Sequence, residues 1–206
     1  MPVTNNSASP AFSYFAKSDV GRKRKDNQDN FGIINKGKWL LAVVCDGMGG
    51  ALGGDIASEI AVSVIIEAFK ERKNSPTIEE LRNVVLDANK KIFNFGIENP
   101  SKKGLGTTLS LVLLDRNGLS LVHVGDSRVM LLNSGVVRQL TIDHTWANEL
   151  KASGELQDEL KDSSPMSHML TRSLGVSKDL IVDCSGPIDF EKGDQLVLWG
   201  RIDQRK

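Results

Sequence analysis

The feature that most constrains this chain is an apolar run that ends abruptly in an aspartate among glycines, Leu40-Leu41-Ala42-Val43-Val44-Cys45-Asp46-Gly47-Met48-Gly49-Gly50. A short run this apolar is typical of a strand buried on both faces. The strand is expected to end at Asp46, and the glycines that follow let backbone come close to whatever the carboxylate holds. A carboxylate beside exposed carbonyls at the end of a buried strand suits a hard cation.

A lone Asp-Gly pair more often marks a turn or a helix cap than a metal site. Here, however, other acidic clusters share the layout: Asp26-Asn27-Gln28-Asp29, Gly125-Asp126-Ser127-Arg128 and Asp143-His144. If the strands before Asp46 and Asp126 end at the same edge of the sheets, Asp29, Asp46 and Asp126 are expected to converge.

Composition narrows the class of protein. With 206 residues the chain can build one domain with a sizeable core. Its 26 basic residues balance 26 acidic ones, so charge favours neither nucleic acid nor an anionic membrane as partner. No apolar run reaches the roughly 18 residues of a spanning helix, and residues 1–10 lack the pattern of a signal peptide. Cys45 and Cys184 form no C-x-x-C pair, and Cys45 is expected to be an inert core thiol. These features predict a cytoplasmic location.

The first half of the chain predicts strands followed by two helices. Strands are expected at 12–16, 30–35 and 39–45, the last two joined as a hairpin by Lys36-Gly37. From Asp55 to Phe69 apolar residues recur at helical spacing. A second helix over 78–95 begins either with Ser75 as its cap or with Thr77 and Glu80 in a capping box. Two such helices should pack antiparallel over one face of a sheet.

The second half predicts an antiparallel meander of strands at 107–114, 119–124, 128–132 and 136–140. Residues 141–178 are mostly polar and are expected to be irregular or helical, at 143–152, 155–160 and 169–174. Two more strands are expected at 181–184 and 195–199. Residues 1–10 read as a flexible tail, and 11–199 read as a single domain.

The order of these motifs resembles the bacterial branch of the metal-dependent PP2C (PPM) Ser/Thr protein phosphatases. The resemblance covers roughly residues 14–199, and each motif follows the last at family-like spacing. The matching segments are Ser18-Asp19-Val20-Gly21 with Arg24 and Asn27-Gln28-Asp29; Val44 to Gly50 with Gly54, Ala57 and Ser58; Gly104 with Gly106-Thr107-Thr108; His123 to Arg128 with Leu140-Thr141 and Asp143-His144; Leu170 to Gly175; and Gly193-Asp194 with Leu196-Val197-Leu198.

The resemblance implies an α+β fold, the PP2C-like αββα sandwich of two antiparallel sheets flanked by antiparallel helix pairs. It implies a protein serine/threonine phosphatase that hydrolyses phosphoserine and phosphothreonine with a metal-activated water. The cofactor would be two Mn²⁺ or Mg²⁺ ions, because oxygen ligands select hard cations. Two such ions lower the pKa of a water between them and clamp the phosphoryl oxygens.

The same resemblance assigns the site residues. Asp46 would bridge the two ions, the Gly47 carbonyl would ligate one of them, and Asp29 would act through metal-bound water. Arg24 would bind the substrate phosphate, to which a planar guanidinium can donate two hydrogen bonds. Asp126 would help to hold a third, weaker ion. From composition alone, the basic run 22–25 is expected to be a solvated charged loop. For Arg22 and Lys23 this remains the interpretation.

Other polar residues receive structural interpretations. His123 is expected to be packed or hydrogen-bonded in the core, His144 to be structural, and Thr107 and Thr108 to pack the sheet. Met48 stands where many eukaryotic members have a histidine acid, so that acid is absent. The partners implied are phosphorylated proteins, substrates of a Ser/Thr kinase, and the chain is expected to be a monomer.

After Trp199 the resemblance ends. The family continues with a Ser-Asp-Gly motif and a later strand led by Asp-Asn, whereas this chain reads Gly200-Arg201-Ile202-Asp203-Gln204-Arg205-Lys206. Residues 200–206 are therefore read as a divergent tail on an incomplete domain. Fewer carboxylates predict weaker cation binding, and a missing strand leaves an edge through which chains could associate. The alternative is a catalytically impaired remnant that only binds metal or phosphoprotein.

Overall fold

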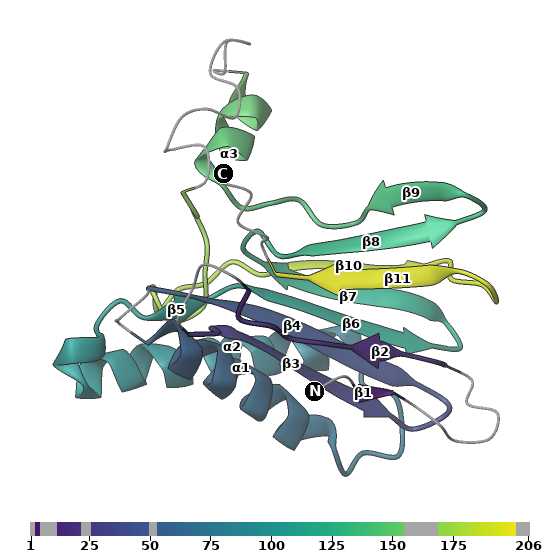
Figure 1. Cartoon of the computed structure of the whole chain (residues 1–206), viewed down its shortest axis with the longest axis horizontal. Coiled ribbons are helices and arrows are strands. Elements are labelled where there is room, and N and C mark those ends of the chain that lie inside the picture. The colour runs from purple at the N-terminus through teal and green to yellow at the C-terminus, as the bar shows by residue number, and fades with distance from the viewer. Residues whose placement is uncertain (1–2, 5–11, 22–25, 50–52, 155–168, 201–206) are drawn as a thin grey trace.

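The computed structural model describes residues 3–4, 12–21, 26–49, 53–154 and 169–200 (Figure 1). Arg24 and residues 155–160 and 201–206, all named above, lie outside these ranges. The elements in order are β1 (Val3–Thr4), β2 (Phe15–Ala16), β3 (Asp29–Asn35), β4 (Leu40–Met48), α1 (Gly54–Phe69), α2 (Ile78–Glu98), a 3-10 turn (Pro100–Lys102), β5 (Gly106–Thr107), β6 (Leu109–Asp115), β7 (Gly118–Val124), β8 (Arg128–Asn133), β9 (Val136–Gln139), α3 (Trp146–Ser153), β10 (Asp183–Ile188) and β11 (Gln195–Trp199).

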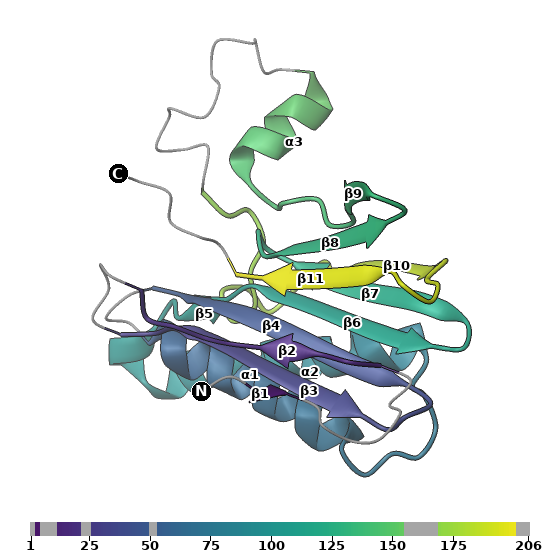
Figure 2. The same ribbon diagram turned by 45° about the vertical axis from the view of Figure 1, so that its right-hand side comes forward.

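The strands form two larger antiparallel sheets and one short pair. The first sheet has the order β10-β7-β6-β4-β3, with β5 added to β4, and the second has the order β11-β8-β9. β1 pairs with β2. Figure 2 shows the second sheet lying over one face of the first, while α1 and α2 lie on the other face. The expected layering of a helix pair on two stacked sheets is therefore confirmed, with one helix pair in the described part of the chain.

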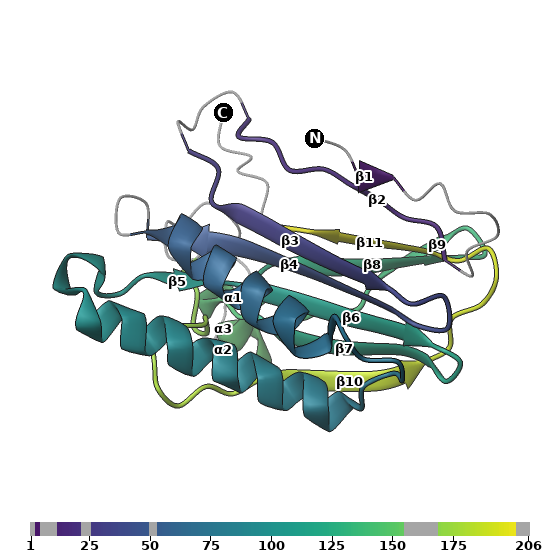
Figure 3. The same ribbon diagram turned by 90° about the horizontal axis from the view of Figure 1, so that it is seen from below.

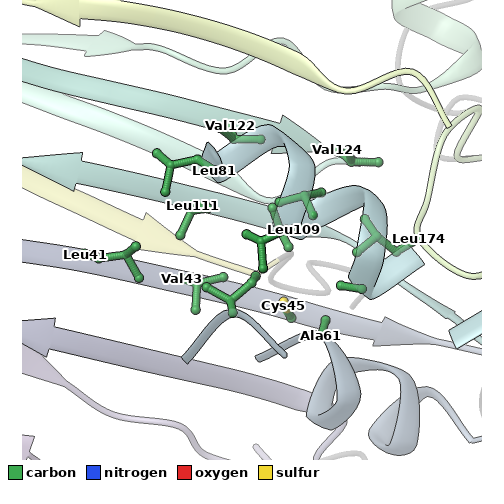
Figure 4. Close-up of a cluster of buried hydrophobic side chains, with 14 of the residues drawn as sticks. Leu41, Val43, Cys45, Ala61, Leu81, Leu109, Leu111, Val122, Val124 and Leu174 are labelled. Carbon is green, nitrogen blue, oxygen red and sulfur yellow. The ribbon is translucent and has the colours of Figure 1, made fainter. Parts of the chain in front are cut away.

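The two faces of β4 pack into two different hydrophobic clusters, one against the helices and one against the second sheet. Leu41, Val43 and Cys45 point toward the helices and join a cluster with Leu109 and Leu111 of β6 (Figure 4). Leu40 faces the second sheet, in a cluster that also contains residues of β8 and β11. Since side chains alternate along a strand, Asp46 lies on the same face as Leu40, at one end of the layer between the sheets.

The helices start and pack as their sequence predicts. Thr77, not Ser75, caps α2: its hydroxyl accepts from the Glu80 amide at 3.2 Å, and the Glu80 carboxylate accepts from the Thr77 amide at 2.8 Å. Ser75 instead donates to Asp115 at 2.7 Å. Figure 3 shows α1 and α2 side by side across the first sheet. None of the described helices is long and apolar enough to cross a membrane.

Several expected boundaries are wrong. β4 does not end at Asp46 but continues to Met48. Val3–Thr4 of the expected tail form a strand, and the expected strand 12–16 is reduced to Phe15–Ala16. The predicted meander is divided, because β6 and β7 belong to the first sheet whereas β8 and β9 belong to the second. Residues 169–174, expected to be irregular or helical, are irregular, and Leu170 and Leu174 make isolated bridges to Thr145 and Thr107.

Candidate metal centre

Two carboxylates face each other across neighbouring strands. Asp29 opens β3 and is the direct register partner of Asp46 on β4. Cross-strand partners project from the same face, about 5 Å apart at Cβ, so two like charges oppose each other there. Asp46 is buried, and Oδ1 of Asp29 is buried without a hydrogen-bond partner among the described residues. A buried, unpaired carboxylate oxygen beside a second carboxylate fits a hard cation such as Mn²⁺ or Mg²⁺.

The backbone after Asp46 is held by a close approach to α1. The Gly47 amide donates to the Gln28 carbonyl at 3.0 Å. A Cβ on Gly47 would lie 2.1 Å from the Gly54 carbonyl oxygen and 2.7 Å from the Gln28 oxygen. Only glycine fits here, which explains the glycines on both sides of this contact. The expected role of the Gly47 carbonyl as a metal ligand stays a prediction.

Gly47→Ala should destabilise the fold by about 2 kcal/mol, because the new methyl group meets backbone atoms that cannot swing aside. Gly37→Ala is the matched control: Gly37 has φ +76, and a Cβ there meets nothing within 4 Å. We expect it to cost about 1 kcal/mol through its left-handed backbone alone. Urea unfolding of metal-free protein measures both. Equal losses would show that the close contact at Gly47 relaxes without cost.

Asp126 lies in the turn between β7 and β8 and is buried. In the part of the chain that the structure describes, no group of three or more His, Cys, Asp or Glu is arranged to hold one metal ion, and the expected convergence of Asp29, Asp46 and Asp126 stays a prediction. The turn nevertheless touches the Asp46 strand, because the Ser127 hydroxyl hydrogen-bonds to the Thr108 hydroxyl and Thr108 binds Asp46. Ligation of a weaker ion by Asp126 stays a prediction.

Two buried histidines hold the other side of this turn. The Gly125 amide donates to Nδ1 of His144 at 3.0 Å, so this nitrogen must be unprotonated. Nε2 of His144 therefore carries the proton and donates to Asp183 at 3.1 Å. His123 donates from Nε2 to the Gly125 carbonyl at 3.0 Å, and its Nδ1 lies 3.0 Å from the Ser110 hydroxyl. Both rings fit the neutral form, and the structural roles expected for them are confirmed.

Burial explains why these histidines stay neutral. Burial and, to a smaller extent, the neighbouring His144 together lower the pKa of His123 to about 4. Burial also lowers the pKa of His144; Arg172 acts in the same direction, and Asp183 opposes it. The ring centroids lie 4.9 Å apart. Protonation of either ring at neutral pH is therefore unfavourable.

Beyond the turn, Asp143 belongs to an ion pair. Nη2 of Arg128 donates to Oδ2 of Asp143 at 2.7 Å, and Nε donates to both oxygens at 3.1 Å. Gln139 adds a hydrogen bond to Oδ1 at 3.0 Å. This fork between a guanidinium and a carboxylate ties β8 to the segment before α3. Asp143 thus has a structural role as the partner of Arg128, and we do not count it with the Asp29–Asp46 pair as a candidate metal ligand.

Sequence reasoning missed two contacts at the centre. A Cβ on Gly200 would lie 3.3 Å from Oδ2 of Asp46 and 3.4 Å from Oδ1 of Asp29, so the end of β11 lies against both carboxylates. From the sequence, Gly200 is expected to begin a divergent tail. From the sequence, Thr108 is expected to pack the sheet within one strand at 107–114. In the structure it lies between β5 and β6, and its hydroxyl accepts from the Asp46 amide, a contact that no local sequence signal marks.

Two opposed carboxylates at one end of the layer between two stacked sheets, with a helix pair on the outer face of one sheet, suit an α+β protein that binds a divalent cation, and comparisons with known proteins identify the family. Residues 21–179 match the family described as Protein phosphatase 2C. The chain is 37% identical over 187 residues to a serine/threonine phosphatase stp of Listeria innocua, covering 88% of this chain and 74% of that protein. It is 35% identical over 186 residues to the protein phosphatase PhpP of Streptococcus pneumoniae, with the same coverage.

Solved structures agree with the sequence matches. The serine/threonine phosphatase of S. agalactiae has a TM-score of 0.77 and 33% identity, over 88% of this chain and 76% of that one. The catalytic domain of the phosphatase PstP, in complex with 2 manganese ions, has a TM-score of 0.73 and 28% identity, over 88% of this chain and 74% of that one. The chain belongs to the protein phosphatase 2C family, and the fold and class implied by its motifs are confirmed.

Proposed function

We propose that this chain hydrolyses phosphoserine and phosphothreonine in proteins with two Mn²⁺ or Mg²⁺ ions as cofactors. The observation that carries the proposal is the opposed Asp29–Asp46 pair, in which a buried oxygen of Asp29 has no hydrogen-bond partner within the described part of the chain. Family membership and relatives named serine/threonine phosphatases support the same reaction. They do not favour the alternative of a remnant that only binds metal or phosphoprotein.

The chain's own residues supply the cation site and the phosphate contact. Asp29, Asp46 and the Gly47 carbonyl would hold the ions, and Asp126 would contribute to a weaker one. When bound, such ions activate a water molecule and neutralise the phosphoryl oxygens. Backbone packing at Gly47 fixes the position from which these ligands act.

Phosphate recognition is assigned to Arg24, whose side chain can form a bidentate contact with a phosphate. A Ser/Thr kinase that produces the phosphorylated substrates, a cytoplasmic location and a monomeric state belong to the same proposal. Formal neutrality, with 26 basic and 26 acidic residues, means that overall charge would not select the substrate. Local contacts near the site would then decide which phosphoproteins bind.

The direct test is release of inorganic phosphate from a phosphothreonine peptide by the full chain, with Mn²⁺ and with EDTA. Turnover that requires Mn²⁺ supports the proposal. The proposal is refuted if folded protein binds Mn²⁺ but releases no phosphate from phosphothreonine or phosphoserine peptides. That result would favour the alternative of a remnant that only binds metal or phosphoprotein.

Arg24→Ala should lower kcat/KM for this peptide by about 100-fold, since a charge-assisted bidentate contact to the reacting phosphate is lost. Arg22→Ala is the matched control in the same basic run, and we expect a change of less than about twofold. Mn²⁺ affinity should be unchanged in both variants. Equal losses of kcat/KM in the two variants would mean that the basic run attracts the substrate by its charge in general and that Arg24 has no specific contact with the phosphate.

A further inference from the structure

The sheet is irregular at the residue opposite Asp46. β4 pairs Gly47 with Thr107 of β5 and Val44 with Ser110 of β6, a register that places Thr108 directly across from Asp46. Thr108 belongs to neither strand. In a regular antiparallel pair the two residues would exchange backbone amide-to-carbonyl hydrogen bonds or none.

Here the side chain of Thr108 takes the place of its own carbonyl. The Thr108 amide donates to the Asp46 carbonyl at 2.9 Å, but the Asp46 amide donates to Oγ1 of Thr108 at 3.0 Å. The Thr108 carbonyl instead accepts from the Thr107 hydroxyl at 3.0 Å. The main chain of Asp46 is thus held by both the backbone and the side chain of one residue.

The same hydroxyl reaches the turn that carries Asp126. Oγ1 of Thr108 hydrogen-bonds to the Ser127 hydroxyl, and both groups are buried. Because the Asp46 amide can only donate, Oγ1 accepts there and shares one further proton with Ser127. The Thr108 side chain therefore links Asp46, which precedes the Gly47 backbone contact, to Ser127, which follows Asp126.

The turn cannot slide away from Thr108. Gly125 packs directly on it, since a Cβ on Gly125 would lie 2.6 Å from Cγ2 and 2.7 Å from Cβ of Thr108. On the far side, His144 and His123 hold the amide and carbonyl of Gly125 at 3.0 Å each. The separation of the turn from β4 is thereby set by Thr108.

We infer that Thr108 is a positioning residue that fixes Asp46 and Asp126 relative to each other for cation binding. The inference rests on the proposed function, because it takes both aspartates as cation ligands. Thr108 contacts no ion or substrate in this scheme and acts only through the two main-chain segments that it joins. Partners behind metal ligands typically change metal affinity by 10- to 100-fold when they are removed.

The test is calorimetric titration of MnCl₂ into metal-free full-length chain. Thr108→Val keeps the shape but removes the hydroxyl, and we expect Mn²⁺ affinity to fall at least about tenfold. Thr108→Ser keeps the hydroxyl and should remain within about threefold of the wild type. The matched control is Thr141→Val, because Oγ1 of Thr141 is also buried and also accepts a strand amide, that of Val129 at 3.2 Å.

Thr141→Val should lose stability as Thr108→Val does, but keep its Mn²⁺ affinity within about twofold. If Thr108→Val does not fold, Ser127→Ala, which removes only the link to the turn, is expected to weaken the weakest Mn²⁺ site. Unchanged Mn²⁺ binding in folded Thr108→Val, an equal loss in Thr141→Val, or no Mn²⁺ binding by the wild type would overturn the inference. Wild-type protein that binds Mn²⁺ without hydrolysing phosphopeptide would refute the proposed function alone.

Discussion

Replacing Asp46 by asparagine is expected to lower Mn²⁺-dependent hydrolysis of a phosphothreonine peptide by about 1,000-fold or more, or roughly 4 kcal/mol of transition-state stabilisation. Asparagine keeps the shape of the side chain and leaves the backbone bonds to Thr108 intact. It removes the charge that, together with Asp29, would balance the bound cations. Initial rates with saturating Mn²⁺ measure the effect.

The same variant should not destabilise the metal-free protein. Asp29 and Asp46 are direct cross-strand partners, and like charges in that arrangement repel each other. Relief of this repulsion should raise the Tm in EDTA by up to about 3 °C, while the rise in Tm that Mn²⁺ gives the wild type should disappear. Loss of activity with a matching loss of Tm in EDTA would mean that Asp46 is needed for folding instead.

Asp87→Asn provides the matched control for this measurement. Asp87 lies on α2, pairs with Lys90 at 3.4 Å and is well exposed, so its charge is screened by solvent. We expect both its activity and its response to Mn²⁺ to equal those of the wild type. A comparable loss in this variant would show that the assay responds to net charge and not to the metal centre.

The layers of the fold could be predicted from the sequence because their signals are local. The stripe of α1 repeats every three or four residues, and the Thr77–Glu80 capping box marks the start of α2 without reference to any distant residue. The hairpin turns at Lys36-Gly37 and 115–118 likewise fix their own strand pairs. Periodicity and turn chemistry are enough for such elements.

The division of the strands between two sheets could not be predicted in the same way. The turn at Gly125 to Ser127 sends β8 to the second sheet, and it is held by His144, a residue from a later segment. The side-chain bond from Thr108 to Asp46 is equally non-local, since 62 residues separate the two. Alternating apolar patterns look the same whether the next strand joins the same sheet or the facing one.

The candidate centre was predictable in its residue types but only partly in its geometry. Asp29 and Asp46 are brought together because both belong to one hairpin, which the sequence specifies. Asp126 depends on the packing of the turn against Thr108, and the approach of Gly200 depends on β11 joining β8. The resemblance to a known family supplied roles for these residues that no local pattern contains.

Acidification is expected to destabilise the metal-free protein mainly through its buried histidines. The pKa of His123 is lowered to about 4 in the folded state by burial and by the neighbouring His144, against about 6.5 when the chain unfolds. Above pH 6.5 the ring is neutral in both states, so the full stabilisation is present. Between pH 6.5 and 4 only the unfolded chain binds the proton, and the free energy of unfolding should fall by about 3 kcal/mol from this residue.

Urea unfolding in EDTA at several pH values between 7.5 and 4 measures this slope. The groups whose charges act on His123 are His144, Asp143 and Asp183, so the wild-type curve contains contributions from several residues. The difference between the wild type and His123→Gln isolates the one at position 123, because glutamine can still donate to the Gly125 carbonyl but does not titrate. We expect the variant to be less stable at pH 7.5 and to lose about 3 kcal/mol less on acidification. Parallel curves would mean that the pKa of His123 is the same in the folded and the unfolded protein, which its burial and its hydrogen bonds to Gly125 and Ser110 argue against.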